Sequence, residues 1–166
     1  MRVRRIQNEE ASLVRALRLA ALSDSPKAFG GTYEQAIALS GEEYEIIARS
    51  RASSETDAIF IATELEEPVG MIGAFFDIST SQPFISSMWV APHFRRAGVG
   101  RQLFLTAQTW LRDRGAQKVN AWVATNNSPA ISFYESLGFV ASEQVAPLPS
   151  DNSLVEQLYV QSSAAV

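Results

Sequence analysis

The first 22 residues show two different spacings of apolar side chains. Residues 2–7 alternate polar and apolar side chains, which predicts a short edge strand. Apolar side chains then recur at helical spacing, as at Leu13 and Leu17, so a helix is expected to run to about Leu22 with Asn8 as its N-cap.

Strand-like and helix-like patterns alternate through the rest of the chain. Helices are predicted at 33–39, 42–51, 98–114 and from 128–129 to 137–138, and strands at 58–63, 69–78, 84–90, 118–124, 139–142 and 154–161. The first two of these strands should turn at Glu66-Glu67-Pro68, and Gly115 should end the longest helix. Ser128 should cap the last helix, with Pro129 at its first helical position. This order predicts a single mixed α/β domain over 1–166 with a central sheet and a frayed tail at 162–166.

The composition excludes several kinds of chemistry. The 166 residues carry a formal net charge of -4, which argues against nucleic acid as a partner. The chain has no cysteine and a single histidine, His93, so disulfides, a cysteine nucleophile and thiolate or multi-histidine metal sites are excluded. We therefore expect no metal.

The apolar segments are too short for a membrane. No apolar run approaches the roughly 18 residues that a membrane-spanning helix needs. The N-terminal segment has basic residues without the apolar core of a signal peptide. These patterns predict a cytoplasmic protein without a membrane partner.

One strand-turn-helix unit suggests a phosphate site. Gly98 and Gly100 lie where the predicted strand at 84–90 passes into the helix at 98–114, with Arg95 and Arg96 just before them. A helix N-terminus presents free N–H groups to an anion, and glycine lets a diphosphate approach the backbone. A capped helix with two solvated arginines explains the same residues equally well. Leu103 replaces the third glycine of a dinucleotide fingerprint, and the P-loop pattern is absent.

Two motifs together resemble the GNAT family of N-acetyltransferases. The first is Arg95-x-x-Gly98-x-Gly100 after Val90-Ala91-Pro92, and the second runs from Asn127 through Tyr134 to Leu137-Gly138-Phe139. The resemblance implies a mixed, mostly antiparallel central sheet of six to seven strands with helices on both faces. It also implies acetyl-coenzyme A as cosubstrate, held where the strand at 84–90 splays from the strand at 118–124.

Site residues follow from the same resemblance. The Val90 amide would polarise the thioester carbonyl, and Tyr134 would be the general acid, although helix packing explains Tyr134 as well. Asn127 matches a cofactor contact, with ordinary helix capping as its alternative. The implied cofactor contacts are Met88, Trp89, Val90, Arg95, Arg96, Ala97, Gly98, Val99, Gly100, Arg101, Asn127, Ala130 and Tyr134.

The general base departs from the family pattern. Many members have a glutamate where this chain has Ser86, beside Ser87, and a serine is no ordinary base near neutral pH. A water relay at Ser86, a base at Glu34 or His93, or an acceptor amine of low pKa would each compensate.

The acceptor side is less defined. Phe29, Tyr33 and Glu34 lie in the segment expected to contact the acceptor. We predict an enzyme that transfers acetyl from acetyl-coenzyme A to the amine of a small molecule or peptide. The alternative is a coenzyme A-binding sensor that has lost turnover. A homodimer is compatible with either function.

Overall fold

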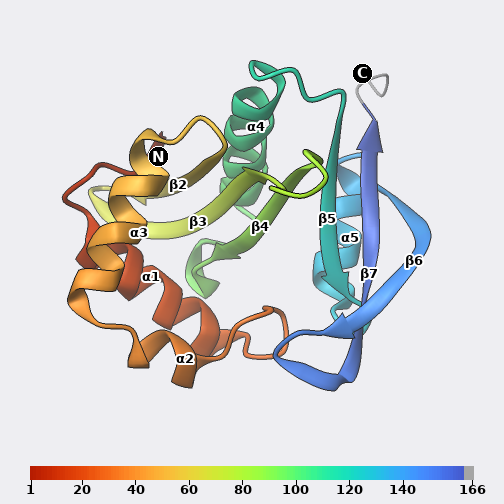
Figure 1. Ribbon diagram of the computed structural model, residues 1–166, viewed down its shortest axis with the longest axis horizontal. Helices are drawn as coiled ribbons and strands as arrows, with labels where there is room; N and C mark the ends of the chain where they lie inside the picture. Colours follow the sequence, from red (N-terminus) through yellow and green to blue (C-terminus); the bar gives the residue numbers. More distant parts are fainter. Residues whose placement is uncertain (163–166) are drawn as a thin grey trace.

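A seven-stranded sheet with strand order β1-β2-β3-β4-β5-β7-β6 runs through residues 1–162, the part of the chain that the computed structural model describes (Figure 1). The elements in chain order are β1 Arg2–Arg5, α1 Ala11–Asp24, α2 Tyr33–Ala38, α3 Gly41–Ser53, β2 Asp57–Glu64, β3 Glu67–Phe76, β4 Pro83–Val90, a 3₁₀ turn η1 Pro92–Phe94, α4 Val99–Arg112, β5 Lys118–Ala124, α5 Ser128–Ser136, β6 Val140–Leu148 and β7 Asp151–Ser162. Only β4 and β5 pair in parallel, which confirms the mixed, mostly antiparallel sheet. Ser162 ends β7, and the rest of the predicted frayed tail lies outside the described residues.

Helices cover both faces of the sheet, as predicted. One core lies under α4 and α5 and contains Leu103, Phe104 and Leu111, which are almost fully buried. The other core lies under α1 and α3 and contains Leu17 and Tyr44. We call these the α4 face and the α1 face of the sheet.

Two helix caps differ from the prediction. α1 begins after Glu10 rather than after Asn8, because the Glu10 carboxylate accepts a hydrogen bond from the Gln7 N–H at 2.8 Å and pairs with Arg4 at 2.6 Å. These two bonds close the turn that Asn8 was expected to cap. α5 is capped by Asn127, whose Oδ1 accepts from the Ala130 N–H at 3.2 Å, so Ser128 is already helical.

The predicted hairpin turn between β2 and β3 is shifted by one residue. Leu65 and Glu66 form the turn with positive φ angles of 46° and 70°, the conformation of a two-residue hairpin loop. Pro68 lies within β3 opposite Thr63, where the register shifts. Gly115 has a φ of 91° and ends α4 as predicted.

Candidate active site

β4 and β5 pair at one point and then separate. Phe84 and Asn120 are the only partners in the register of these parallel strands. Beyond them, β4 continues to Val90 and β5 to Ala124 as unpaired neighbours, and Figure 1 shows the two ribbons diverging. We call this opening in the backbone pairing the strand gap; it lies where the sequence predicts that the two strands splay.

A bulge at Ser87 determines which side chains of β4 point to the α1 face and which point to the α4 face. Met71 pairs with Trp89 and Gly73 with Ser86, so β4 carries one extra residue, and Ser87 takes a φ of 52°. Ser86 and Ser87 both line a pocket on the α1 face. Met88 packs against the core on the α4 face.

Backbone N–H groups of β4 point into the strand gap. The Ala91 N–H donates to the Val69 carbonyl at 2.8 Å, so Ala91 faces β3. Alternate residues of a strand turn their N–H groups to opposite sides, so Val90 and Met88 turn theirs towards β5. The sequence-predicted amide donor of Val90 is therefore directed into the gap.

The loop after β4 leads into a helix start without a side-chain cap. Gly98 is the N-cap residue of α4 and has a φ of 84°, and Arg96 also has a positive φ, of 63°. The N–H groups of the first turn of α4 have no acceptor within the helix and point out of its positive end. Ala97 and Arg101 are exposed, whereas the side chain of Val99 is buried in the core. Val99 can therefore contact an anion only through its backbone N–H.

The two glycines of this loop serve different purposes. A Cβ at Gly98 would have no atom within 4 Å, so its positive φ is what requires glycine. A Cβ at Gly100 would lie 3.0 Å from Met88 Cε and 3.3 Å from the Phe133 ring. Gly100 therefore allows the start of α4 to approach β4 and α5 closely.

Arg95 is held by the protein itself. Its Nε donates to the Val90 carbonyl at 2.8 Å, and its guanidinium pairs with Asp24 at the end of α1. Trp89 Nε1 donates to the same carboxylate at 3.0 Å. Burial tends to raise the pKa of Asp24, but hydrogen bonds from Ser25, Trp89 and Arg95 lower it overall. These contacts fix the end of β4 and place the Trp89 side chain on the α1 face, away from α4.

Tyr134 lies in α5 and packs into the core of the α4 face. It is 7% exposed, and its ring contacts Phe133 and Phe139 edge-on. Burial raises its pKa well above that of an ordinary tyrosine, so the phenol keeps its proton at neutral pH. Asn127 and Ala130 bond to each other in the cap of the same helix, and their predicted cofactor contacts remain predictions.

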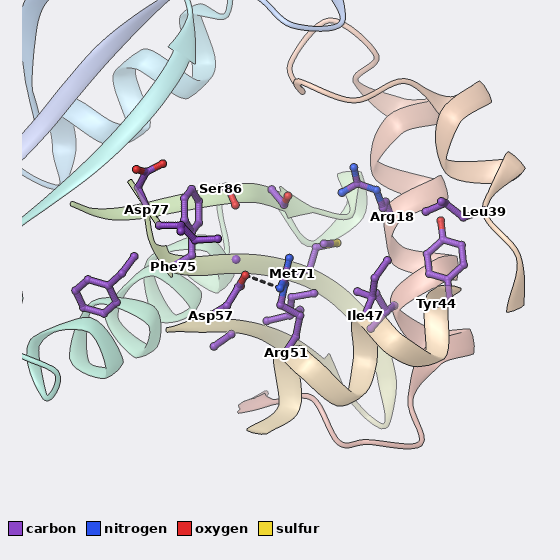
Figure 2. Close-up of a pocket in the computed structure, with 17 residues that line it drawn as sticks. Arg18, Leu39, Tyr44, Ile47, Arg51, Asp57, Met71, Phe75, Asp77 and Ser86 are labelled. Atoms are coloured by element: carbon purple, nitrogen blue, oxygen red, sulfur yellow. Dashed lines mark ion pairs between the residues drawn. The ribbon is translucent and has the colours of Figure 1, made fainter. Parts of the chain in front are cut away.

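A pocket of about 500 Å³ opens on the α1 face of the sheet (Figure 2). Ser86, Ser87 and Gly73 line it from the sheet, and α1 and α3 contribute side chains including Arg18 and Tyr44. A Cβ at Gly73 would lie 2.8 Å from Ser86 Oγ, so the glycine leaves room for that hydroxyl above the sheet.

The residues predicted to contact the acceptor are dispersed. Phe29 is half-buried and lines a smaller pocket with Arg18 and Ser87. Tyr33 and Glu34 are exposed on α2 and do not line the pocket of Figure 2. His93 is exposed in η1, next to residues 95–100. We call these residues the phosphate loop, after their predicted ligand.

Two charged residues on the α1 face of the sheet were missed by the sequence reasoning. Arg18 lies on α1 and faces the pocket. Glu156 lies on β7 opposite Ala124, which is the last residue of β5. Ala121 and Tyr159 pair on the α4 face, and side chains alternate along a strand, so Glu156 points to the α1 face, as Ser86 does. No local motif marks either residue, because both acquire their position only through the fold.

The same architecture occurs in known acetyltransferases. A GNAT-family acetyltransferase of Streptococcus pneumoniae aligns with a TM-score of 0.79 and 21% identity over 97% of this chain and 98% of that chain. The PaiA N-acetyltransferase of Thermoplasma acidophilum was solved in complex with coenzyme A. It aligns with a TM-score of 0.75 and 15% identity over 97% of this chain and 98% of that chain. The fold is therefore that of the GNAT acetyltransferases.

The sequence comparison identifies the family. The model of the acetyltransferase (GNAT) family matches residues 22–139, and the chain belongs to this family. It is 32% identical over 96 residues to an uncharacterised N-acetyltransferase of Methanocaldococcus jannaschii, an overlap of 55% of this chain and 42% of that protein. It is 29% identical over 62 residues to the aminoglycoside N(6')-acetyltransferase type 1 of Salmonella typhimurium, covering 37% of this chain and 43% of that protein. The chain thus spans less than half the length of either curated relative.

Residues 1–162 contain neither a candidate metal site nor a membrane-spanning helix. No group of three or more histidine or acidic side chains is placed to hold a metal ion in this part of the chain. None of its helices is long and apolar enough to cross a bilayer.

Proposed function

We propose that this protein transfers the acetyl group of acetyl-coenzyme A directly to a primary amine. The observation that carries the proposal is the strand gap, which opens beside the uncapped N-terminus of α4. A thioester arm lying in the gap would place its diphosphate at the helix start and its carbonyl at the free N–H of Val90.

The phosphate loop fits a diphosphate. The uncapped amides of Val99, Gly100 and Arg101 supply donors, and Arg96 adds positive charge beside them. The neighbouring structure from Thermoplasma acidophilum contains coenzyme A, and a related acetyltransferase of Salmonella typhimurium contains acetyl-coenzyme A. Both support acetyl-coenzyme A as the cosubstrate here.

Two groups of this chain would assist the chemistry. Attack by the amine places negative charge on the thioester oxygen, and the Val90 N–H can stabilise that charge by about 3 kcal/mol. The carbon–sulfur bond then breaks, and the phenol of Tyr134 can donate its proton to the departing thiolate. Burial raises the pKa of Tyr134, so the phenol carries its proton at neutral pH but is a weaker acid than an ordinary tyrosine.

Because Ser86 stands where many family members have a glutamate, another group must remove the proton from the ammonium of the acceptor. Ser86 can hold a water molecule but cannot act as a base itself. Glu156 points to the same face of the sheet and lies beside the end of β5. It makes no hydrogen bond or ion pair within residues 1–162, and burial raises its pKa. A carboxylate with these properties is suited to accept a proton.

Cofactor binding and turnover are tested separately. Calorimetry should show coenzyme A binding, and a thiol-release assay over a panel of primary amines should show amine-dependent turnover. Absence of binding would refute the proposal. Binding with no thiol release from any amine would instead favour the coenzyme A sensor, to which the loss of the family glutamate at Ser86 points.

A further inference from the structure

The pocket on the α1 face contains a cation without a protein partner. Arg18 is half-buried on α1, and it makes no hydrogen bond or ion pair within residues 1–162. Figure 2 shows its guanidinium on the side of the helix that faces β4. A guanidinium that lines a pocket without a protein anion can pair with a ligand that supplies one, so its position favours an anionic ligand.

The loop after α1 leaves space for this side chain. A Cβ at Gly31 would lie 2.9 Å from a terminal nitrogen of Arg18. Any larger residue at Gly31 would therefore displace the guanidinium. The glycine has no positive φ that would explain it otherwise.

The other charges around the pocket are already engaged. Arg51 pairs with Asp57 at 2.5 Å, as Figure 2 shows. The Asp77 carboxylate accepts hydrogen bonds from the backbone and side chains of Ser79 and Thr80 in its own turn. Arg18 is left as one uncompensated positive charge, which suits a single carboxylate.

The rest of the lining is largely apolar. Val14, Ile47, Ile59, Met71 and Phe75 are among the apolar side chains that line it from α1, α3 and the sheet. Arg18 and Ser87 also line the smaller pocket together, and Ser87 directly precedes the strand segment that faces the gap. An anion at Arg18 would therefore lie close to the place where the acetyl group is transferred.

We propose that the acceptor is an α-amino acid with an apolar side chain, whose carboxylate pairs with Arg18 and whose side chain occupies the pocket. The short distance between amine and carboxylate in such a molecule matches the closeness of Arg18 to the end of β4. This assignment of the acceptor rests on the proposed acetyl transfer. The carboxylate site itself can be tested without turnover.

The test compares amino acids with the same molecules lacking the carboxylate. L-Leucine is compared with isopentylamine and L-phenylalanine with phenethylamine, by calorimetry on the coenzyme A-loaded protein and by thiol release. The intact protein should bind the amino acids at least tenfold more tightly. Arg18→Gln should weaken their binding roughly 10- to 100-fold, the range of a lost charge-assisted hydrogen bond, and leave the amines unchanged.

Two further variants control the result. Arg49→Gln removes an exposed arginine of α3 that pairs only with Glu45, and it should keep the preference. Gly31→Ala should weaken amino acid binding while Arg18 remains, which tests the same contact in a chain that keeps the charge.

The outcomes separate this inference from the proposed function. Equal binding of amino acids and amines, or a preference that persists in Arg18→Gln, would overturn the carboxylate site even if amines are acetylated. A carboxylate preference lost in Arg18→Gln, with no thiol release from any acceptor, would establish the site and refute acetyl transfer.

Discussion

At the scale of single residues, backbone strain concentrates at the end of β4. Among residues 1–162, five non-glycine residues have positive φ, and Leu65, Glu66 and Ser81 of these lie in hairpin turns. The other two, Ser87 and Arg96, flank the segment that faces the strand gap. Such conformations cost of order 1–3 kcal/mol each and persist where the surroundings impose them. Their position on either side of Val90 is what a site with a fixed backbone donor requires.

Gly98 offers a test of the phosphate loop. Gly98→Ala adds no clash but forces a Cβ into the left-handed region, so it should cost about 1–2 kcal/mol of stability and weaken coenzyme A binding. Gly98→Asn should be milder, because asparagine tolerates this conformation. Calorimetry and thermal unfolding check both effects. Unchanged coenzyme A affinity in Gly98→Ala would show that the loop conformation does not matter for binding.

Tyr134 offers a test of the acid. Tyr134→Phe keeps the buried ring but removes the proton donor, so kcat should fall by about 10²-fold while coenzyme A affinity is retained. Tyr159→Phe changes another buried tyrosine of the same core and should leave kcat unchanged. Steady-state kinetics and calorimetry provide the two readouts. If both variants lose the same activity, the effect is one of packing.

At the scale of elements, Asp24 ties the end of α1 to the end of β4. Its carboxylate receives the Trp89 indole N–H and the Arg95 guanidinium, and Arg95 also bonds the Val90 carbonyl. The strand that bears the amide donor is thus positioned by a helix on the α1 face. This connection joins the α1 face to the strand that borders the gap.

Asp24→Asn should destabilise the protein in a pH-dependent way. The pKa of Asp24 is lowered in the folded state, so its contribution is complete at neutral pH. The difference in free energy of unfolding from the unmodified protein should shrink as the pH falls below about 4 and through the lowered pKa. Denaturant unfolding at several pH values measures it. Asp113→Asn, at an exposed position after α4, is the matched control.

The sequence predicted elements better than contacts between them. Hydrophobic period predicts the strands and α-helices, because each depends on side chains a few residues apart, although β6 runs to Leu148, beyond the predicted 139–142, and η1 was not predicted. Asp24 bonds to Trp89 across 65 residues, and Glu156 comes to lie beside the end of β5 only through the register of β5 and β7. Neither relation leaves a local pattern. The bulge at Ser87 could not be predicted either, because it is defined by how β4 pairs with β3 and not by the sequence of β4 alone.

At the scale of the whole molecule, the two candidate binding regions lie on opposite faces of the sheet. The phosphate loop, α4 and α5 lie on one face, and the pocket with Arg18 and Ser86 lies on the other. The strand gap separates β4 from β5 between these faces. An acceptor and a thioester can therefore meet in the gap from opposite sides, which direct transfer in a ternary complex requires.

Proton removal is the step that distinguishes the remaining mechanisms. If Glu156 is the base, kcat should rise with pH through its pKa, which burial raises, and the inflection should not move when the acceptor changes. If the acceptor loses its proton unaided, the inflection should follow the pKa of the amine and move when the acceptor is changed.

Glu156→Gln decides between these two mechanisms. With Glu156 as base, kcat should fall about 10²-fold in Glu156→Gln, and the inflection in the pH profile should vanish.

The stability of this variant can be predicted from the same pKa. The raised pKa of Glu156 means that the folded state disfavours the ionised carboxylate, so stability falls as the pH rises through the interval between the unfolded and folded pKa values. Glu156→Gln should therefore be at least as stable as the unmodified protein at neutral pH, and a loss of turnover could not be attributed to unfolding. The exposed Glu143→Gln on β6 is the matched control. A pH–rate profile that follows the amine in both variants, with kcat unchanged, would assign proton loss to the acceptor.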